Sequence, residues 1–285
     1  MACTWSQLCR TGGLSIFTVA LASCGGGSDG AGKCYSPTPA VCDTLGVPRS
    51  FPQPVPADPA DANPAGLYKG LTSTGRSFAS LVLDDGSFYS IYSQVNNPSI
   101  VAGGGRGTVK TSGTSFSISD AVDFSFEGLG TNVASITGTV DERKFIQGSI
   151  NYPTAGQNIT FSANYSSDYE LTASISTIAG KYAGASESVN SSNGISSSDA
   201  VTFDINASGD ITGTGNSGCT FSGTIKPRTS GNAYTVTVTF GASPCQYPGT
   251  TITGASYFDR TSNIAYAVAS TPTGSANFIT SATKQ

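Results

Sequence analysis

The chain has 285 residues, a formal net charge of −4 and only 11% charged residues. This balance argues against a nucleic-acid footprint or a polybasic membrane patch, both of which need clustered Lys and Arg. Histidine, the commonest general base and metal ligand, is absent, so we expect no metal and no cofactor.

The first 23 residues have the pattern of an export signal, with an apolar run at 14–22 that is too short to span a bilayer. The following Leu21-Ala22-Ser23-Cys24 resembles the lipobox of bacterial lipoproteins. That resemblance implies removal of 1–23 and acylation of Cys24, palmitate being one such group. In such lipoproteins an Asp directly after the cysteine retains the protein at the inner membrane. Gly25 occupies that position here, which implies an outer-membrane location. An ordinary secretory signal is the alternative.

Residues 24–64 are predicted to be a spacer that follows the lipidated cysteine. Eight prolines fall between positions 37 and 64. Proline-rich segments favour extended polyproline II and act as semi-rigid spacers. The spacer is therefore expected to hold a folded body away from a membrane.

The rest of the chain is duplicated. Five short segments recur in the same order at offsets of 114–119 residues. The pairs are 65–70 with 179–184, 107–110 with 223–226, 111–113 with 229–231, 136–138 with 252–254, and 153–156 with 272–274. We expect two related units, 65–166 and 180–285, joined by a linker at 167–179.

Each unit has the alternation of short antiparallel strands. Residues 77–83 and 87–92 flank Asp84-Asp85-Gly86, which is a hairpin pattern. About eight evenly spaced strands per unit predict an all-β fold of two tandem meanders, each closing as a β-barrel that can hold one small ligand. The run 103–107, with four glycines and Arg106, is expected to be a bend between strands rather than a phosphate cradle.

Seven cysteines are present, of which two fall in the signal and Cys24 is assigned to lipid. The remaining four form two sequence-near pairs, Cys34 with Cys42 and Cys219 with Cys245. An even number of cysteines in an exported chain predicts disulfides, and we expect the local pairing. Unpaired buried thiols are the alternative.

The two units begin with Gly-x-Tyr-x-Gly, at 66–70 and at 180–184, and 121–124 reads Ala-Val-Asp-Phe. With the tethering cysteine and the spacer, these motifs resemble surface lipoproteins of the transferrin-binding-protein B and factor-H-binding-protein type. The resemblance implies β-barrel units at the cell surface. It transfers no binding residue, because the end of the chain lacks the acidic, Ala-rich turn of that family.

No catalytic set is recognisable. Six carboxylates are candidates for glycoside hydrolysis, but their positions in turns and on alternating strands favour solvation: Asp84, Asp85, Asp123, Glu127, Asp204 and Asp210. The charged turn at 141–144 is a candidate contact for a partner.

We therefore expect a non-catalytic outer-membrane or cell-surface lipoprotein, held by its lipid anchor. Its partner would be a host or envelope protein or a small ligand, and not nucleic acid. A periplasm-facing structural or assembly lipoprotein is the first alternative, and a carboxylate-based glycosidase is the second.

Overall fold

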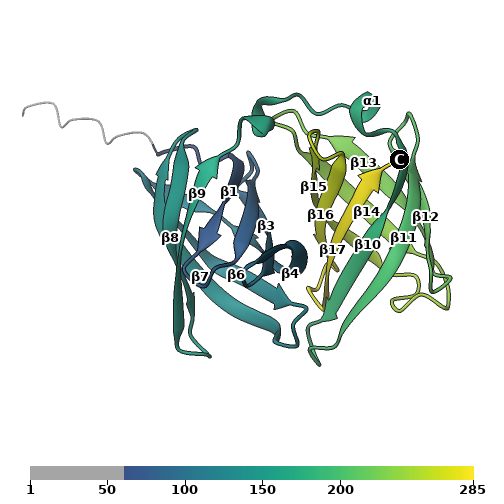
Figure 1. Cartoon of the computed structure of the whole chain (residues 1–285), viewed down its shortest axis with the longest axis horizontal. Helices are drawn as coiled ribbons and strands as arrows, with labels where there is room; N and C mark the ends of the chain where they lie inside the picture. Colours follow the sequence, from purple (N-terminus) through teal and green to yellow (C-terminus); the bar gives the residue numbers. More distant parts are fainter. Residues whose placement is uncertain (1–60) are drawn as a thin grey trace, which may run out of the picture. The chain divides into compact units, whose positions relative to one another are not determined.

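The computed structural model describes residues 61–285. The segments with alternating polar and apolar residues after position 65 form antiparallel strands in it. The predicted signal, Cys24, and the pair Cys34 and Cys42 lie outside the described residues. Figure 1 shows two β-barrels in succession along the chain, the first in blue to teal and the second in green to yellow. None of the helices in 61–285 is long and apolar enough to cross a membrane.

The first barrel is a meander whose strands pair with their neighbours in sequence. The strands are β1 Gly66–Thr72, β2 Ser77–Val82, β3 Ser87–Gln94, β4 Asn97–Thr108, β5 Lys110–Ser112, β6 Ser115–Ser125, β7 Gly130–Asp141, β8 Phe145–Tyr152 and β9 Gln157–Tyr165. The first strand pairs with the last, and β4 pairs with β6, which closes the ring. The short β5 continues β4 beyond Val109 and also pairs with β6.

A 3₁₀ turn, Ser167–Glu170, and a short helix, α1 Ile175–Ile178, connect the two barrels. The second barrel contains β10 Gly180–Asn190, β11 Ser196–Ile205, β12 Asp210–Gly215, β13 Thr220–Pro227, β14 Tyr234–Phe240, β15 Thr251–Asp259, β16 Ile264–Ser270 and β17 Ala276–Lys284. It closes through β10 and β17. The predicted all-β class and the two tandem eight-stranded barrels are confirmed.

The repeated segments occupy equivalent places in the two barrels. The first pair opens β1 and β10, the second spans β4–β5 and β13, and the 136–138 and 252–254 pair lies in β7 and β15. The last pair forms the turns between β8 and β9 and between β16 and β17. Each strand of one unit therefore has a counterpart in the other.

The tyrosine of each Gly-x-Tyr-x-Gly motif points back along the chain and closes one end of its barrel. The Tyr68 hydroxyl donates to the Pro64 carbonyl at 3.1 Å, and the Tyr182 hydroxyl donates to the Ile178 carbonyl at 2.6 Å. Both rings are fully buried. The segment that precedes each barrel is thereby fastened across the end at which the chain enters, which we call the closed end.

The last glycine of each motif is required by the close approach of the first and last strands. A Cβ on Gly70 would lie 2.0 Å from the Ser162 carbonyl oxygen, and one on Gly184 would lie 2.1 Å from that of Ser281. Contacts this short do not occur, so any side chain would push the strands apart. Each motif thus supplies the tyrosine that closes one end of its barrel and the glycine at the contact between the first and last strands, which we call the seam.

The glycine-rich run 103–107 is not a bend, and this expectation was wrong. It lies inside β4, paired with β3 on one side and β6 on the other. Glycine is needed because neighbours fill the space where side chains would be: a Cβ on Gly103 would lie 2.3 Å from the Tyr92 hydroxyl oxygen and one on Gly107 2.5 Å from Ile118.

Candidate binding cavities

The first barrel encloses a cavity of about 450 Å³, which is within the usual range for small-molecule sites. Inward-facing apolar side chains from six strands form its floor and walls. They are Phe78, Val82, Phe88, Phe116, Ile118, Ile136, Ile146, Ile150, Ile159 and Phe161. The cavity is therefore apolar over most of its depth.

Three glycines of β4 lie on the inner side of this barrel wall. Positions 103, 105 and 107 of β4 face the interior, as shown by the inward side chains a Cβ there would meet. Gly105, for example, would meet Ser90 at 3.0 Å and Phe88 at 3.9 Å. Along this stretch the barrel wall is backbone alone, because side chains of neighbouring strands occupy the space beside it.

Polar groups collect at the other end of the first barrel, which we call the mouth end. It carries the turns at 73–76, 95–96, 126–129 and 153–156. Nine polar side chains line the cavity at this level and form a collar: Thr72, Thr74, Arg76, Tyr92, Asp123, Ser125, Asn132, Tyr152 and Gln157. A molecule in this cavity would meet apolar walls below and polar groups above.

Arg76, the only cation among the residues that line this cavity, is already engaged. One guanidinium nitrogen forms an ion pair with Glu127 at 2.6 Å, and another donates to the Ser93 carbonyl at 2.9 Å. The guanidinium carbon also lies 5.4 Å from the centre of the Tyr92 ring, within cation–π range. Its charge is therefore largely satisfied within the protein.

Asp123 is the acid inside the collar, and its electrostatic position is unfavourable. Burial raises the pKa of its carboxyl to about 6, although the Tyr92 hydroxyl and the Arg76 charge act in the opposite direction. Burial and the Asp123 charge also raise the pKa of the Tyr92 and Tyr152 hydroxyls. Among residues 61–285, no Lys or Arg forms an ion pair with Asp123.

A β-bulge places Asp123 inside. Along β6 the pairing to β7 shifts between Ile118 and Ala121, so that β6 has one extra residue there. Such a bulge reverses which side of the strand faces the interior. The interior positions are therefore Phe116 and Ile118 before the bulge and Asp123 and Ser125 after it. The prediction that Asp123 is solvated was wrong for this reason.

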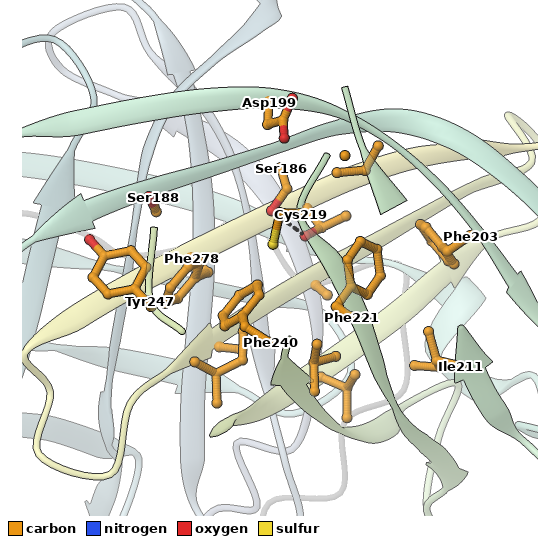
Figure 2. A pocket seen from close by; sticks show the side chains of 18 of the residues that line it. Ser186, Ser188, Asp199, Phe203, Ile211, Cys219, Phe221, Phe240, Tyr247 and Phe278 are labelled. Carbon is orange, nitrogen blue, oxygen red and sulfur yellow. Dashed lines mark hydrogen bonds between the residues drawn. The ribbon is translucent and has the colours of Figure 1, made fainter. Parts of the chain in front are cut away.

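The second barrel has a smaller cavity of about 280 Å³, lined by apolar residues from most of its strands. Figure 2 shows the rings of Phe221, Phe240 and Phe278 lying around it. The polar groups again gather at the mouth end, where serines from β10 and β11 line the opening. Asp199 there accepts a hydrogen bond from Ser217 at 2.6 Å.

A disulfide fixes a loop at this second opening. Cys219 and Cys245 are joined, as the sequence predicts, with a Cα separation of 4.4 Å. The Gln246 side chain, next in the chain, accepts a hydrogen bond from Ser197 at 2.6 Å. Tyr247 packs edge-on against Phe278 at a centroid distance of 5.3 Å. The loop 241–250 is therefore held against the mouth, whereas the first barrel has no such loop among its described residues.

Exposed apolar side chains cluster at the mouth ends. The large hydrophobic residues that remain exposed are Leu71, Val95, Ile100, Leu129, Val133 and Ile195. Five belong to the first barrel, in or beside its mouth-end turns, and Leu129 and Val133 are 68% and 64% exposed. Val95 and Leu129 also line the first cavity.

The other carboxylates proposed for hydrolysis do not gather in one cavity. Asp84 and Asp85 pair with Arg228, and Asp204 pairs with Lys181. Of the six candidates, Asp123 alone lines a cavity. The charged turn at 141–144 connects β7 to β8 at the closed end, opposite the exposed apolar residues.

No family model matches the chain, and no curated protein matches it. Among solved structures, transferrin binding protein B from serogroup B Neisseria meningitidis matches with 12% identity and a TM-score of 0.30, over 74% of this chain and 66% of that one. This chain thus spans just under two thirds of that protein's length.

HpuA from Kingella denitrificans, solved in complex with human haemoglobin, matches with 12% identity and a TM-score of 0.28, over 81% of this chain and 91% of that one. A putative outer membrane protein from Bacteroides fragilis matches with 14% identity and a TM-score of 0.26, over 78% and 97%. The protein type that the Gly-x-Tyr-x-Gly motifs resemble is therefore among the matches. At these TM-scores the matches assign no function to this chain.

Proposed function

We propose that this chain is a non-catalytic, lipid-anchored protein of the outer membrane, exposed at the cell surface, and that it binds a host or envelope protein through the mouth end of its first barrel. The observation that carries the proposal is the group of five exposed apolar side chains at that end. Large exposed apolar patches are typical of interaction sites, and binding residues concentrate on loops held by a rigid scaffold.

Two features of the sequence support the proposed location. The Leu21-Ala22-Ser23-Cys24 pattern supports acylation, and stable anchoring needs more than one acyl chain. The proline-rich spacer provides reach. A periplasm-facing structural role shares both features and differs only in exposure to the outside.

The non-catalytic part of the proposal is supported by how the acids are used. The ion pairs of Asp84, Asp85 and Asp204 hold these carboxylates at the protein surface. Hydrolysis of a glycosidic bond needs two carboxyl groups flanking one substrate. Asp123 is the one acid among the residues that line the first cavity, so it lacks a second acid lining the same space.

The anchor and the surface location are tested in cells. Labelling with radioactive palmitate should mark the wild-type chain and fail to mark a Cys24→Ser variant. Protease added to intact cells should degrade the wild-type chain. Survival under shaving, with degradation after the envelope is opened, would instead support the periplasmic alternative.

The binding surface is tested with the unacylated Cys24→Ser chain, purified, immobilised and exposed to host proteins, glycans and envelope extracts. A partner retained by this chain should be lost by a Leu129→Ser, Val133→Ser double variant. The control is Lys226→Ser, a surface change on the second barrel. Equal retention by both variants would move the binding surface elsewhere, and no retention from any source would count against a binding role.

A further inference from the structure

The first cavity has two chemically distinct parts. Its walls are apolar side chains, and its collar contains Asp123, Tyr92 and Tyr152. An amphipathic molecule satisfies both parts at once, because its apolar body would be removed from water while its polar head stays at the collar.

The charge of the collar selects the head group. Arg76 is paired with Glu127, so these two charges largely offset each other, and Asp123 has no ion-pair partner among residues 61–285. Taking an unpaired charge out of water is unfavourable, and a cation beside it relieves that cost. A head group that is itself negative would face Asp123 and would have to displace Glu127 to reach Arg76.

We propose that the cavity of the first barrel binds a cationic amphiphile, with its apolar body among the floor residues and a protonated amine against the Asp123 carboxylate. The serine hydroxyls of positions 90 and 125 line the same space and provide further acceptors. This site goes beyond the proposed partner surface, since it lies inside the barrel and needs no protein partner.

The second cavity does not share this chemistry. It is smaller, its loop is held against the mouth by the disulfide, and the acid that lines it, Asp199, is half-buried and already accepts hydrogen bonds from Ser217. A cationic head would therefore gain less there. The difference allows the two cavities to be told apart by experiment.

The test uses the full chain carrying Cys24→Ser, so that no acyl group competes for the cavity. The fluorescent probe is N-phenyl-1-naphthylamine, displaced by dodecylamine, dodecanol or dodecanoate below their micellar concentrations. The three ligands share one chain length and differ in the head group. Dodecylamine should displace the probe at concentrations about tenfold or more below those of dodecanol and dodecanoate, as expected for a charge-assisted contact.

Asp123→Asn should remove the preference for the amine over the alcohol while dodecanol binding is kept. The matched control is Asp120→Asn, which makes the same charge change on the same strand. Asp120 is exposed and bonded to Thr108 outside the cavity, so this variant should keep the preference. Preference for dodecanoate, absence of displacement, or an amine preference that survives Asp123→Asn would overturn the proposal.

A cavity-filling variant, Ser90→Phe, locates the probe. Circular dichroism checks its fold, and Ser125→Phe replaces it if it does not fold. Probe binding should be lost in the folded variant. Probe binding that persists would place the ligand in the second barrel and overturn the proposal. Failure here leaves the partner screen unaffected, because that screen reads the exposed side chains at 129 and 133.

Discussion

Replacing Asp123 by Asn should stabilise the protein at neutral pH. Burial raises the pKa of this carboxyl from 3.8 to about 6 in the folded state. A difference of about two units corresponds to about 3 kcal/mol between the protonated and ionised forms. The folded protein thus prefers a neutral side chain at this position, and the asparagine amide supplies one of nearly the same shape.

The sign of the pH dependence follows from this difference. Between the unfolded and folded pKa values the folded state binds more protons, so the stability of the wild-type chain falls as pH rises from about 4 to about 6. The gain from Asp123→Asn should therefore be absent near pH 4 and reach about 3 kcal/mol above pH 7. A loss of folding stability at a residue that serves binding, as at Asp123, is typical of the trade-off between stability and function.

Urea unfolding followed by circular dichroism at several pH values measures this gain, with Asp120→Asn as the control. The hydrogen bonds from Thr108 outweigh burial and lower the pKa of Asp120, so its replacement should not stabilise the protein. A gain from Asp123→Asn that is the same at pH 4 and pH 7, or no gain at all, would refute the reasoning.

Four further changes have defined outcomes. Replacing Cys219 and Cys245 by Ser opens a cross-link with a sequence separation of 26, which should cost about 3–4 kcal/mol in urea unfolding of the second barrel and leave the first unchanged. Tyr182→Phe should lower the free energy of unfolding by about 1–3 kcal/mol, because it leaves the buried Ile178 carbonyl without its donor. Tyr68→Phe should lower it by less in the same assay, because the hydrogen bond of Tyr68 is longer and only partly buried. Gly184→Ala should cost several kcal/mol or prevent folding, since its Cβ would meet backbone at 2.1 Å. Circular dichroism and yield report that outcome, and a variant of wild-type stability would show that the seam can widen.

The fold was predictable from the sequence because its main determinants are local. Alternating residues, tight turns and five segments repeated in register define strands and their order without reference to distant contacts. The pairing of Cys219 with Cys245 followed from the same meander, since two successive strands bring their outer ends together. The described structure bears out both.

The interior of the first barrel was less predictable, because it depends on one extra residue in β6. The shift between Ile118 and Ala121 turns the later half of the strand over, and strict alternation across this point places Asp123 on the wrong side. The adjacent polar pair Ser119-Asp120 interrupts the apolar alternation, and this was the available signal of a bulge.

The glycines of β4 were misassigned for a related reason. A run such as 103–107 is typical of a bend when only local propensity is considered. Its role in the protein is steric, since Tyr92 and Ile118 occupy the space beside it. Both contacts join side chains of neighbouring strands to β4, and local propensity alone does not show which side chains lie there.

The way the chain enters each barrel has a mechanical consequence. In the first barrel, β1 begins and β9 ends at the closed end, and the two strands are antiparallel neighbours. Force applied between these two chain ends would open their hydrogen bonds one after another, as in a zipper. Force applied between the entry point and the opposite loops would instead shear β1 against both neighbours, so that many hydrogen bonds must break together. The barrel should therefore withstand traction on a captured partner better than traction along its own chain.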